Sequence, residues 1–264
     1  MLLQEAMRLR GKTALVTGGG RGIGAATARA LATAGAAVAV AARTRAEVER
    51  VAASILSEGG SARPCVADVT TPADVESLVK EVTDSLGPID ILVCGAGHAT
   101  SAPLLQTPYE EFESLWRAHL GGALLCIQAT LPGMLQRSWG RIVTIASVAG
   151  RVGAPYISAY ASAKHALVGL TRCLAMEVAG RGVTANSVCP GYVDTPMTAE
   201  SIQRIMRKTG CDETSARQAL EQNSPQKRLM SADEVGHLVL MLCDDRARGI
   251  NGQAIVLDGG GVQA

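Results

Sequence analysis

The sequence predicts an α/β protein with a doubly wound parallel sheet of about seven strands and helices on both faces. Short apolar runs alternate with longer amphipathic stretches along the 264 residues, which is the pattern of repeated strand–helix units joined by right-handed crossovers. The apolar runs are rich in Val, Ile and Ala and lack polar alternation, as expected for strands covered on both faces. No linker or charge block interrupts this pattern, so we expect one domain over residues 1–264.

The first half of the chain is predicted to hold four strand–helix units. The first strand runs directly into a glycine-rich turn, and the third helix starts with Pro72, a residue that suits the first helical turn. The expected strands are 12–17, 36–42, 62–67 and 89–93, and the expected helices are 22–34, 45–57, 72–86 and a long region over 107–135.

The second half continues the alternation and adds a polar stretch. A capping box, Ser231-x-x-Glu234, opens the last expected helix. The expected strands are 141–146, 183–188 and 254–257, and the expected helices are 156–179, a polar region over 198–222, and 231–242.

Composition excludes several classes of function. The net charge is +1, from 25 basic and 24 acidic residues, so no electrostatic footprint for nucleic acid or an anionic membrane is expected. The low aromatic content, 3%, implies a core of Ala, Val, Leu and Ile.

The cysteines and the N-terminus indicate a cytoplasmic protein. The seven cysteines have no C-x-x-C spacing and most lie in apolar contexts, so we expect buried thiols in a reducing compartment. The four histidines do not cluster with them, and no metal site is expected. Residues 1–10 are too short and too charged for a signal peptide, and no apolar run approaches the roughly 20 residues of a membrane span.

A glycine-rich turn predicts a dinucleotide site. Five glycines lie in residues 18–24, between the first strand and a helix, whereas an ordinary strand–helix turn needs only one. Glycines allow the backbone to approach a pyrophosphate, and the helix N-terminus presents free N–H groups to it. This placement gives the predicted sheet its Rossmann-type character.

Two arginines favour NADP(H) over NAD(H). An NAD enzyme usually places Asp or Glu near the end of the second strand to bind the ribose 2′-hydroxyl. Here that strand ends Ala42-Arg43-Thr44 without a carboxylate, and Arg21 already lies in the glycine loop. Two guanidiniums suit a 2′-phosphate through charge-assisted hydrogen bonds.

A tyrosine and a lysine share one face of the helix predicted over 156–179. Tyr160 and Lys164 are four residues apart. A phenol with a pKa near 10 is a poor base at neutral pH, and a nearby cation lowers that pKa. Tyr160 is therefore a candidate acid/base. Ser147 follows the fifth strand, at the sheet edge where ligands bind in open α/β folds.

Together these motifs make the chain similar to the short-chain dehydrogenase/reductase family, whose pattern T-G-x-x-x-G-x-G matches from Thr17 onward. The resemblance spans Gly11 to Gly260. It implies Ser147, Tyr160 and Lys164 as catalytic residues, with Ser147 orienting the substrate oxygen and Lys164 lowering the pKa of Tyr160 and holding the nicotinamide ribose. It implies a cofactor site of Gly18, Arg21, Gly22, Ile23, Gly24, Arg43, Asp68, Val69, Gly97, Tyr160, Lys164, Pro190, Gly191, Val193 and Thr195.

The sequence departs from the family pattern at two positions. The family commonly has Asn-Asn-Ala-Gly after the fourth strand, but this chain has Cys94-Gly95-Ala96-Gly97. A family Asn that completes the catalytic tetrad and holds a relay water aligns with His119. We hypothesise that His119 replaces that Asn as a catalytic residue and adds pH dependence, since imidazole titrates near neutrality. A packed helix histidine without a catalytic part is the alternative.

The substrate is expected to be a ketone under a lid over residues 197–229. His98, Val148, Tyr156 and Tyr192 are candidates for the pocket wall, beside Ser147. The pattern is similar to 3-oxoacyl-thioester reductases and polyketide-type ketoreductases. Carrier-protein reductases often have Arg at the position of Met176. Its absence here argues against a carrier-protein-bound substrate and leaves CoA thioesters and free ketones as the alternatives.

Two further expectations concern assembly and an alternative role. The resemblance implies a homotetramer built through the long helices of the fifth and sixth crossovers. A non-catalytic NADP sensor on the same fold is the competing class; turnover of a carbonyl that is lost in Tyr160→Phe would discriminate against it.

Overall fold

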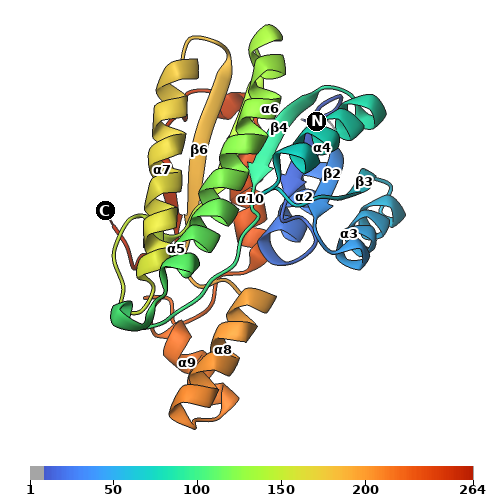
Figure 1. Cartoon of the computed structure of the whole chain (residues 1–264). Coiled ribbons are helices and arrows are strands. Elements are labelled where there is room, and N and C mark those ends of the chain that lie inside the picture. The colour runs from blue at the N-terminus through green and yellow to red at the C-terminus, as the bar shows by residue number, and fades with distance from the viewer. Residues whose placement is uncertain (1–8, 264) are drawn as a thin grey trace.

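The computed structural model describes residues 9–263 and contains a seven-stranded sheet in the order β3-β2-β1-β4-β5-β6-β7 (Figure 1). All six strand pairs are parallel, which confirms the predicted fold class. Most of the segment 1–10, where we expect no signal peptide, lies outside the described residues. The strands are β1 (Thr13–Thr17), β2 (Ala37–Ala42), β3 (Ser61–Val66), β4 (Ile89–Cys94), β5 (Gly140–Ile145), β6 (Val183–Pro190) and β7 (Ala254–Leu257).

Helices cover both faces of the sheet and form two separate apolar layers. On one face pack α2 (Gly22–Thr33), α3 (Arg45–Ser57) and α10 (Ala232–Cys243). On the other pack α4 (Pro72–Leu86), α6 (Gly122–Gln136) and α7 (Ser158–Val178). Small residues allow close contact: a Cβ on Gly236 would lie 3.0 Å from the backbone of Ala26, so α10 and α2 nearly touch. The low aromatic content is explained by this tight packing.

The strand order reverses between β1 and β4, which makes their carboxyl ends the topological switch point where α/β sheets bind ligands. Thr17 joins the two strand ends there. Its hydroxyl donates to the carbonyl of Val93 at 3.2 Å and accepts from the N–H of Gly95 at 3.2 Å. Thr17 thus supplies a strand-to-strand connection beside Cys94, where the family amide is missing.

The long helical region expected over 107–135 is interrupted. It consists of α5 (Tyr109–Trp116), a π-helical turn (Arg117–Gly121) and α6, without a break in the chain direction. By length and composition alone this continuous helix, Tyr109–Gln136, would be able to cross a membrane. Polar residues interrupt the apolar ones along this helix, so the sequence contains no uninterrupted apolar run of that length there. In the structure its segments pack on α4, α7 and β4.

The polar region expected over 198–222 forms two helices instead of one. α8 (Pro196–Thr209) ends at Gly210, which has a φ of +73° and caps the helix in the left-handed conformation. α9 (Glu213–Glu221) then begins at Asp212, whose side chain accepts from the N–H of Ser215. The pair projects beyond one end of the sheet (Figure 1) and encloses its own small apolar cluster, Ile202, Ala216, Leu220 and Leu229.

Candidate active site

A cleft of about 620 Å³ lies along the carboxyl ends of β1, β2 and β4. Its floor requires glycine. Gly18 has a φ of +67°, and a Cβ there would lie 2.6 Å from the carbonyl oxygen of Gly95; a Cβ on Gly24 would overlap the carbonyl oxygen of Gly18. The loop therefore folds back against the end of β4 and opens onto the N-terminus of α2, a cradle suited to a pyrophosphate.

The predicted cofactor residues of the first half of the chain come together around this cleft. Besides the glycine loop, its lining includes Ile23, Arg43, Asp68, Val69 and Gly97. Asp68 accepts from both the N–H and the hydroxyl of Thr70, at 2.9 and 2.8 Å. These hydrogen bonds, led by the backbone one and assisted by the charge of Arg43, lower the pKa of Asp68. Asp68 is therefore a fixed carboxylate at the end of β3.

The charged rim of the cleft is more complex than the sequence predicted. Arg43 is exposed on the rim. Arg21 is also exposed, but it pairs with Glu200 of α8 at 3.3 Å, so it links the glycine loop to that helix. Arg50 of α3, which the sequence analysis did not single out, donates to the carbonyl of Gly20 at 3.4 Å. Glu47 brings a carboxylate to the same rim.

Ser147, Tyr160 and Lys164 meet beyond the carboxyl end of β5. Ser147 follows that strand, and its hydroxyl accepts from the N–H of Ala149 at 3.1 Å. Lys164 is buried, and its ammonium donates to the carbonyl of Ile145 at 2.7 Å. A buried hydroxyl cluster holds α7 in place, since Thr144 bonds Thr171 at 3.0 Å and Ser187 at 2.8 Å.

The pKa of Tyr160 differs from the expectation that Lys164 lowers it. Burial raises the pKa of Tyr160 to about 12, and the hydroxyl of Ser147 only partly opposes this rise. The Lys164 ammonium lies 5.5 Å from the centre of the phenol ring, bound to a backbone carbonyl. Burial lowers the pKa of Lys164 itself to about 7. Without cofactor, Tyr160 is therefore a protonated phenol at neutral pH, ready to donate a proton.

His119 lies behind Tyr160, inside the π-helical turn. Its ring is 5.4 Å from the Tyr160 ring in an edge-on arrangement. Nε2 lies 2.7 Å from the carbonyl of His98, whereas the buried Nδ1 has no hydrogen-bond partner among residues 9–263. A Cβ on Gly97 would overlap the imidazole, so the glycine makes room for it.

The expectation that His119 titrates near neutrality is wrong. Burial, with the charge of Lys164 as a second cause, holds the pKa of His119 well below 6.5. The imidazole is neutral at pH 7. Since Nε2 faces a carbonyl it carries the proton, and Nδ1 is left as an acceptor.

A second cavity of about 750 Å³ lies on the other side of Tyr160. It is mainly apolar and is lined by residues predicted for the substrate and the nicotinamide, including Ser147, Tyr156, Tyr192, Pro190, Gly191 and Val193. His98, expected on the substrate wall, lines the first cleft instead and stacks on His119 at 6.2 Å. The two cavities share Ile23, Ala146, Tyr160, Thr195 and Met197.

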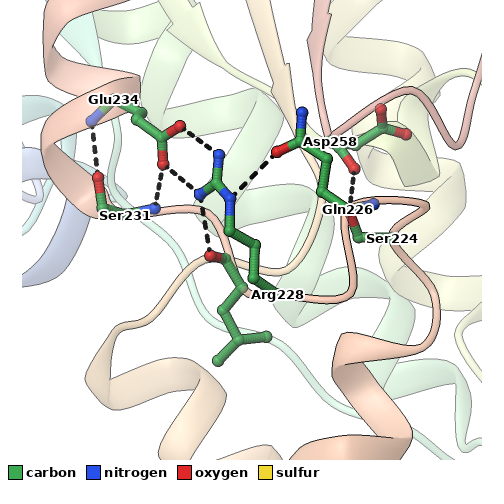
Figure 2. Close-up of polar contacts among 7 residues, drawn as sticks. Ser224, Gln226, Arg228, Ser231, Glu234 and Asp258 are labelled. Carbon is green, nitrogen blue, oxygen red and sulfur yellow. Dashed lines mark hydrogen bonds and ion pairs between the residues drawn. The ribbon is translucent and has the colours of Figure 1, made fainter.

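A polar network between α9 and α10 contributes Ser224, Arg228 and Asp258 to the lining of the second cavity (Figure 2). The guanidinium of Arg228 binds both carboxylate oxygens of Glu234, at 2.8 and 2.7 Å, and the side chain of Gln226 at 3.1 Å. Ser224 donates to the carbonyl of Asp258 at 2.9 Å. These contacts fix the segment between α9 and α10 to the helix and to the C-terminal loop.

Comparisons with known proteins place this geometry in a family. The family model described as enoyl-(acyl carrier protein) reductase matches residues 18–261. The D-beta-hydroxybutyrate dehydrogenase of Cupriavidus necator is 35% identical, covering 96% of this chain and 99% of its own. The 3-oxoacyl-[acyl-carrier-protein] reductase of Thermotoga maritima is 32% identical, covering 96% and 99%. The structure of an actinorhodin polyketide ketoreductase variant with NADPH superposes with a TM-score of 0.93 at 31% identity, covering 98% and 100%.

Proposed function

The chain belongs to the short-chain dehydrogenase/reductase family, a family of nicotinamide-dependent oxidoreductases acting on CH–OH groups, and we propose that it is an NADP-dependent ketoreductase. It interconverts a ketone and a secondary alcohol. The observation that carries this proposal is the position of Tyr160, whose phenol lies between the two cavities with Ser147 and Lys164 beside it. A reacting carbonyl in the second cavity is then adjacent to a cofactor in the first.

The residues of the first cleft fit a dinucleotide. The glycine cradle and the N-terminus of α2 bind the pyrophosphate, and Arg21 and Arg43 bind the 2′-phosphate that distinguishes NADP. Asp68 and Val69 would hold the adenine, and Lys164 would hold the nicotinamide ribose. Thr195, which lines both cavities, would hold the nicotinamide carboxamide together with Val193. When bound, NADPH supplies the hydride that the carbonyl carbon accepts.

The proton comes from the protein. Ser147 donates a hydrogen bond to the carbonyl oxygen, and Tyr160 transfers its hydroxyl proton to that oxygen as the C=O bond becomes C–O–H. The raised pKa of Tyr160 keeps this proton in place until the oxygen becomes basic. Lys164 and a water held by Nδ1 of His119 return a proton to the phenolate, which deepens the relay hypothesis for His119.

The substrate proposed first is a 3-oxoacyl thioester or a related bulky ketone, and the second is a free small ketone. The volume and apolar lining of the second cavity support both. The names of the similar dehydrogenase and reductase also point to hydroxy and oxo compounds. All seven cysteines are free, which supports a reducing, cytoplasmic location.

We propose a homotetramer on the strength of exposed apolar side chains. Trp116, Leu124 and Met176, on α5, α6 and α7, are 42, 38 and 80% exposed. Apolar side chains in such positions favour burial against another subunit.

The test is NADPH consumption with a panel of ketones and 3-oxoacyl-CoA thioesters. We expect turnover that is lost in Tyr160→Phe. Tyr109→Phe, which changes an exposed phenol outside both cavities, serves as the matched control and retains full activity. Tight NADPH binding without turnover of any carbonyl would favour the sensor.

A further inference from the structure

The substrate cavity carries an excess of positive charge. Four charged side chains line it: Arg204, Lys208, Arg228 and Asp258. Arg228 is neutralised, because both oxygens of Glu234 occupy its guanidinium (Figure 2). Asp258 faces backbone N–H groups, from which its carboxylate accepts three hydrogen bonds of 2.8 to 3.0 Å. Among residues 9–263, neither Arg204 nor Lys208 forms an ion pair, so the cavity keeps a net positive charge even with the carboxylate of Asp258 counted.

Within the described part of the chain, Arg204 lines the cavity without an ion pair, unlike Arg217 and Arg228 of the segment 197–229. Arg217 pairs with Asp194 and Glu221, and Arg228 pairs with Glu234. Among residues 9–263, Arg204 forms no ion pair with a carboxylate; its guanidinium donates to the hydroxyl of Ser201 at 3.2 Å. The side chain is half-buried. A guanidinium in such a place gains most from an anionic partner, because two parallel N–H bonds match a carboxylate.

The contact with Ser201 gives the guanidinium a fixed direction. Ser201 donates to the carbonyl of Met197 one turn earlier, at 3.1 Å, so its oxygen is free to accept from Arg204. Both Ser201 and Arg204 line the cavity. Lys208 lies one further turn along α8 on the same side of the helix.

Tyr192 connects Arg204 to the reacting centre. Burial raises the pKa of Tyr192, and the charge of Arg204 opposes that rise. Tyr192 in turn is among the lesser causes, after burial, of the raised pKa of Tyr160. Arg204, Tyr192 and Tyr160 all line this cavity.

We propose that Arg204, assisted by Lys208, binds the carboxylate of an oxo-acid substrate and so makes the enzyme selective for ketones that carry a negative charge. This inference rests on the proposed ketoreductase function and narrows its substrate class. The guanidinium holds one end of the substrate, while Ser147 and Tyr160 hold the carbonyl oxygen at the other. Phosphates of a CoA thioester are a second source of negative charge, which the experiment separates.

The experiment compares each oxo acid with its neutral methyl ester. Acetoacetate, levulinate and 5-oxohexanoate vary the distance between carbonyl and carboxylate, and acetoacetyl-CoA tests the phosphates. We expect kcat/KM to favour at least one acid over its ester by tenfold or more. Arg204→Ala should lower kcat/KM for that acid by about ten- to one-hundredfold, mainly through KM, because a hydrogen bond to a charged group is lost.

The controls separate this inference from the proposed function. Arg204→Ala should leave the ester rate within twofold, Arg204→Lys should recover part of the acid rate, and Arg207→Ala, on the same helix but outside the cavity, should change neither rate. Turnover of esters without preference for any acid overturns the carboxylate site but leaves the ketoreductase intact. An effect of Arg204→Ala confined to acetoacetyl-CoA assigns the charge to phosphates and also overturns it. No turnover of any ketone overturns both proposals.

Discussion

Replacing Lys164 by methionine removes a buried charge and keeps most of the side-chain volume. Lys164 is 4% exposed, and within residues 9–263 its ammonium makes one hydrogen bond, to the carbonyl of Ile145. Burial lowers the pKa of Lys164 from 10.5 to about 7. Without cofactor, the protonated lysine therefore destabilises the fold, and its removal should stabilise the protein.

The magnitude follows from that pKa. The drop from 10.5 to about 7 corresponds to about 5 kcal/mol, at about 1.4 kcal/mol for each pH unit. The unfolded chain stays protonated up to pH 10.5, whereas the folded protein loses the proton near pH 7, so the cost is complete below pH 7 and declines above it. Leaving the carbonyl of Ile145 unpaired costs about 1–3 kcal/mol. Lys164→Met should therefore gain roughly 2–4 kcal/mol below pH 7.

The assay is urea unfolding of cofactor-free wild type and Lys164→Met at pH 6, 7, 8 and 9. The difference between the two proteins is needed because burial raises the pKa of Cys126 and Cys243 from 9.0 to about 12, which begins to reduce the stability of both proteins as pH approaches 9. Lys80→Met is the control: Lys80 is exposed and its pKa is raised by Asp84, so its loss should not stabilise. The advantage of Lys164→Met should shrink by about 1 kcal/mol per pH unit above pH 7.

Two results would refute this reasoning. If Lys164→Met is no more stable than wild type at pH 6, the buried charge carries no net cost. If the difference is constant from pH 7 to pH 9, Lys164 does not titrate in that range. Neither result depends on turnover, so the prediction is independent of the proposed reaction.

Four further predictions test the site. Arg43→Asp should weaken NADPH binding by tenfold or more and NADH binding far less, measured by fluorescence titration; equal losses would contradict the phosphate site. Gly97→Ala should lower both the Tm and turnover, because the added Cβ would overlap the His119 ring and the φ at position 97 is +154°. His119→Ala should restore part of the Tm in the double variant, and an unchanged Tm in Gly97→Ala would argue against the contact. Glu234→Gln should lower the Tm at neutral pH by a modest, solvent-screened amount; because the pKa of Glu234 is depressed from 4.5 to about 2, the gap should close as pH falls through that window, and a pH-independent gap contradicts the ion pair. The kcat–pH profile of the wild type should show no ionisation of His119 between pH 6.5 and 8, since its pKa is lowered; a break there that disappears in His119→Asn would contradict the neutral imidazole.

The fold was predictable because its signals are local. An apolar run without polar alternation predicts a strand covered on both faces wherever the run occurs. The interruption of the long helix at Arg117–Gly121 was not predictable. A π-helical turn changes the backbone hydrogen bonding, while the apolar pattern of the region stays helical. The division between α8 and α9 was also not predicted. Gly210 is a helix stop signal, but the polar residues on both sides of it have a helical pattern that continues past it.

The site was predictable where spacing alone carries it. Tyr160 and Lys164 share a helix face, and the glycine loop follows a strand, so both could be read from neighbouring residues. The ion pair of Arg21 could not be predicted in this way, because its partner Glu200 is 179 positions away. The pKa values of Tyr160 and His119 were misjudged for the same reason: burial, their largest cause, depends on elements far apart in sequence.

The relay hypothesis for His119 requires its imidazole to take over the hydrogen bonds of the family Asn. π-helical turns are rare and are found frequently at functional sites. Here the turn carries the imidazole, whose Nε2 is fixed by the carbonyl of His98 while the glycine at 97 makes room for the ring. A neutral imidazole fixed in this tautomer offers one acceptor, Nδ1, in a buried place beside Tyr160 and Lys164. An asparagine amide also offers both donor and acceptor groups, so the proposed replacement retains a donor and an acceptor at the position and adds no charge.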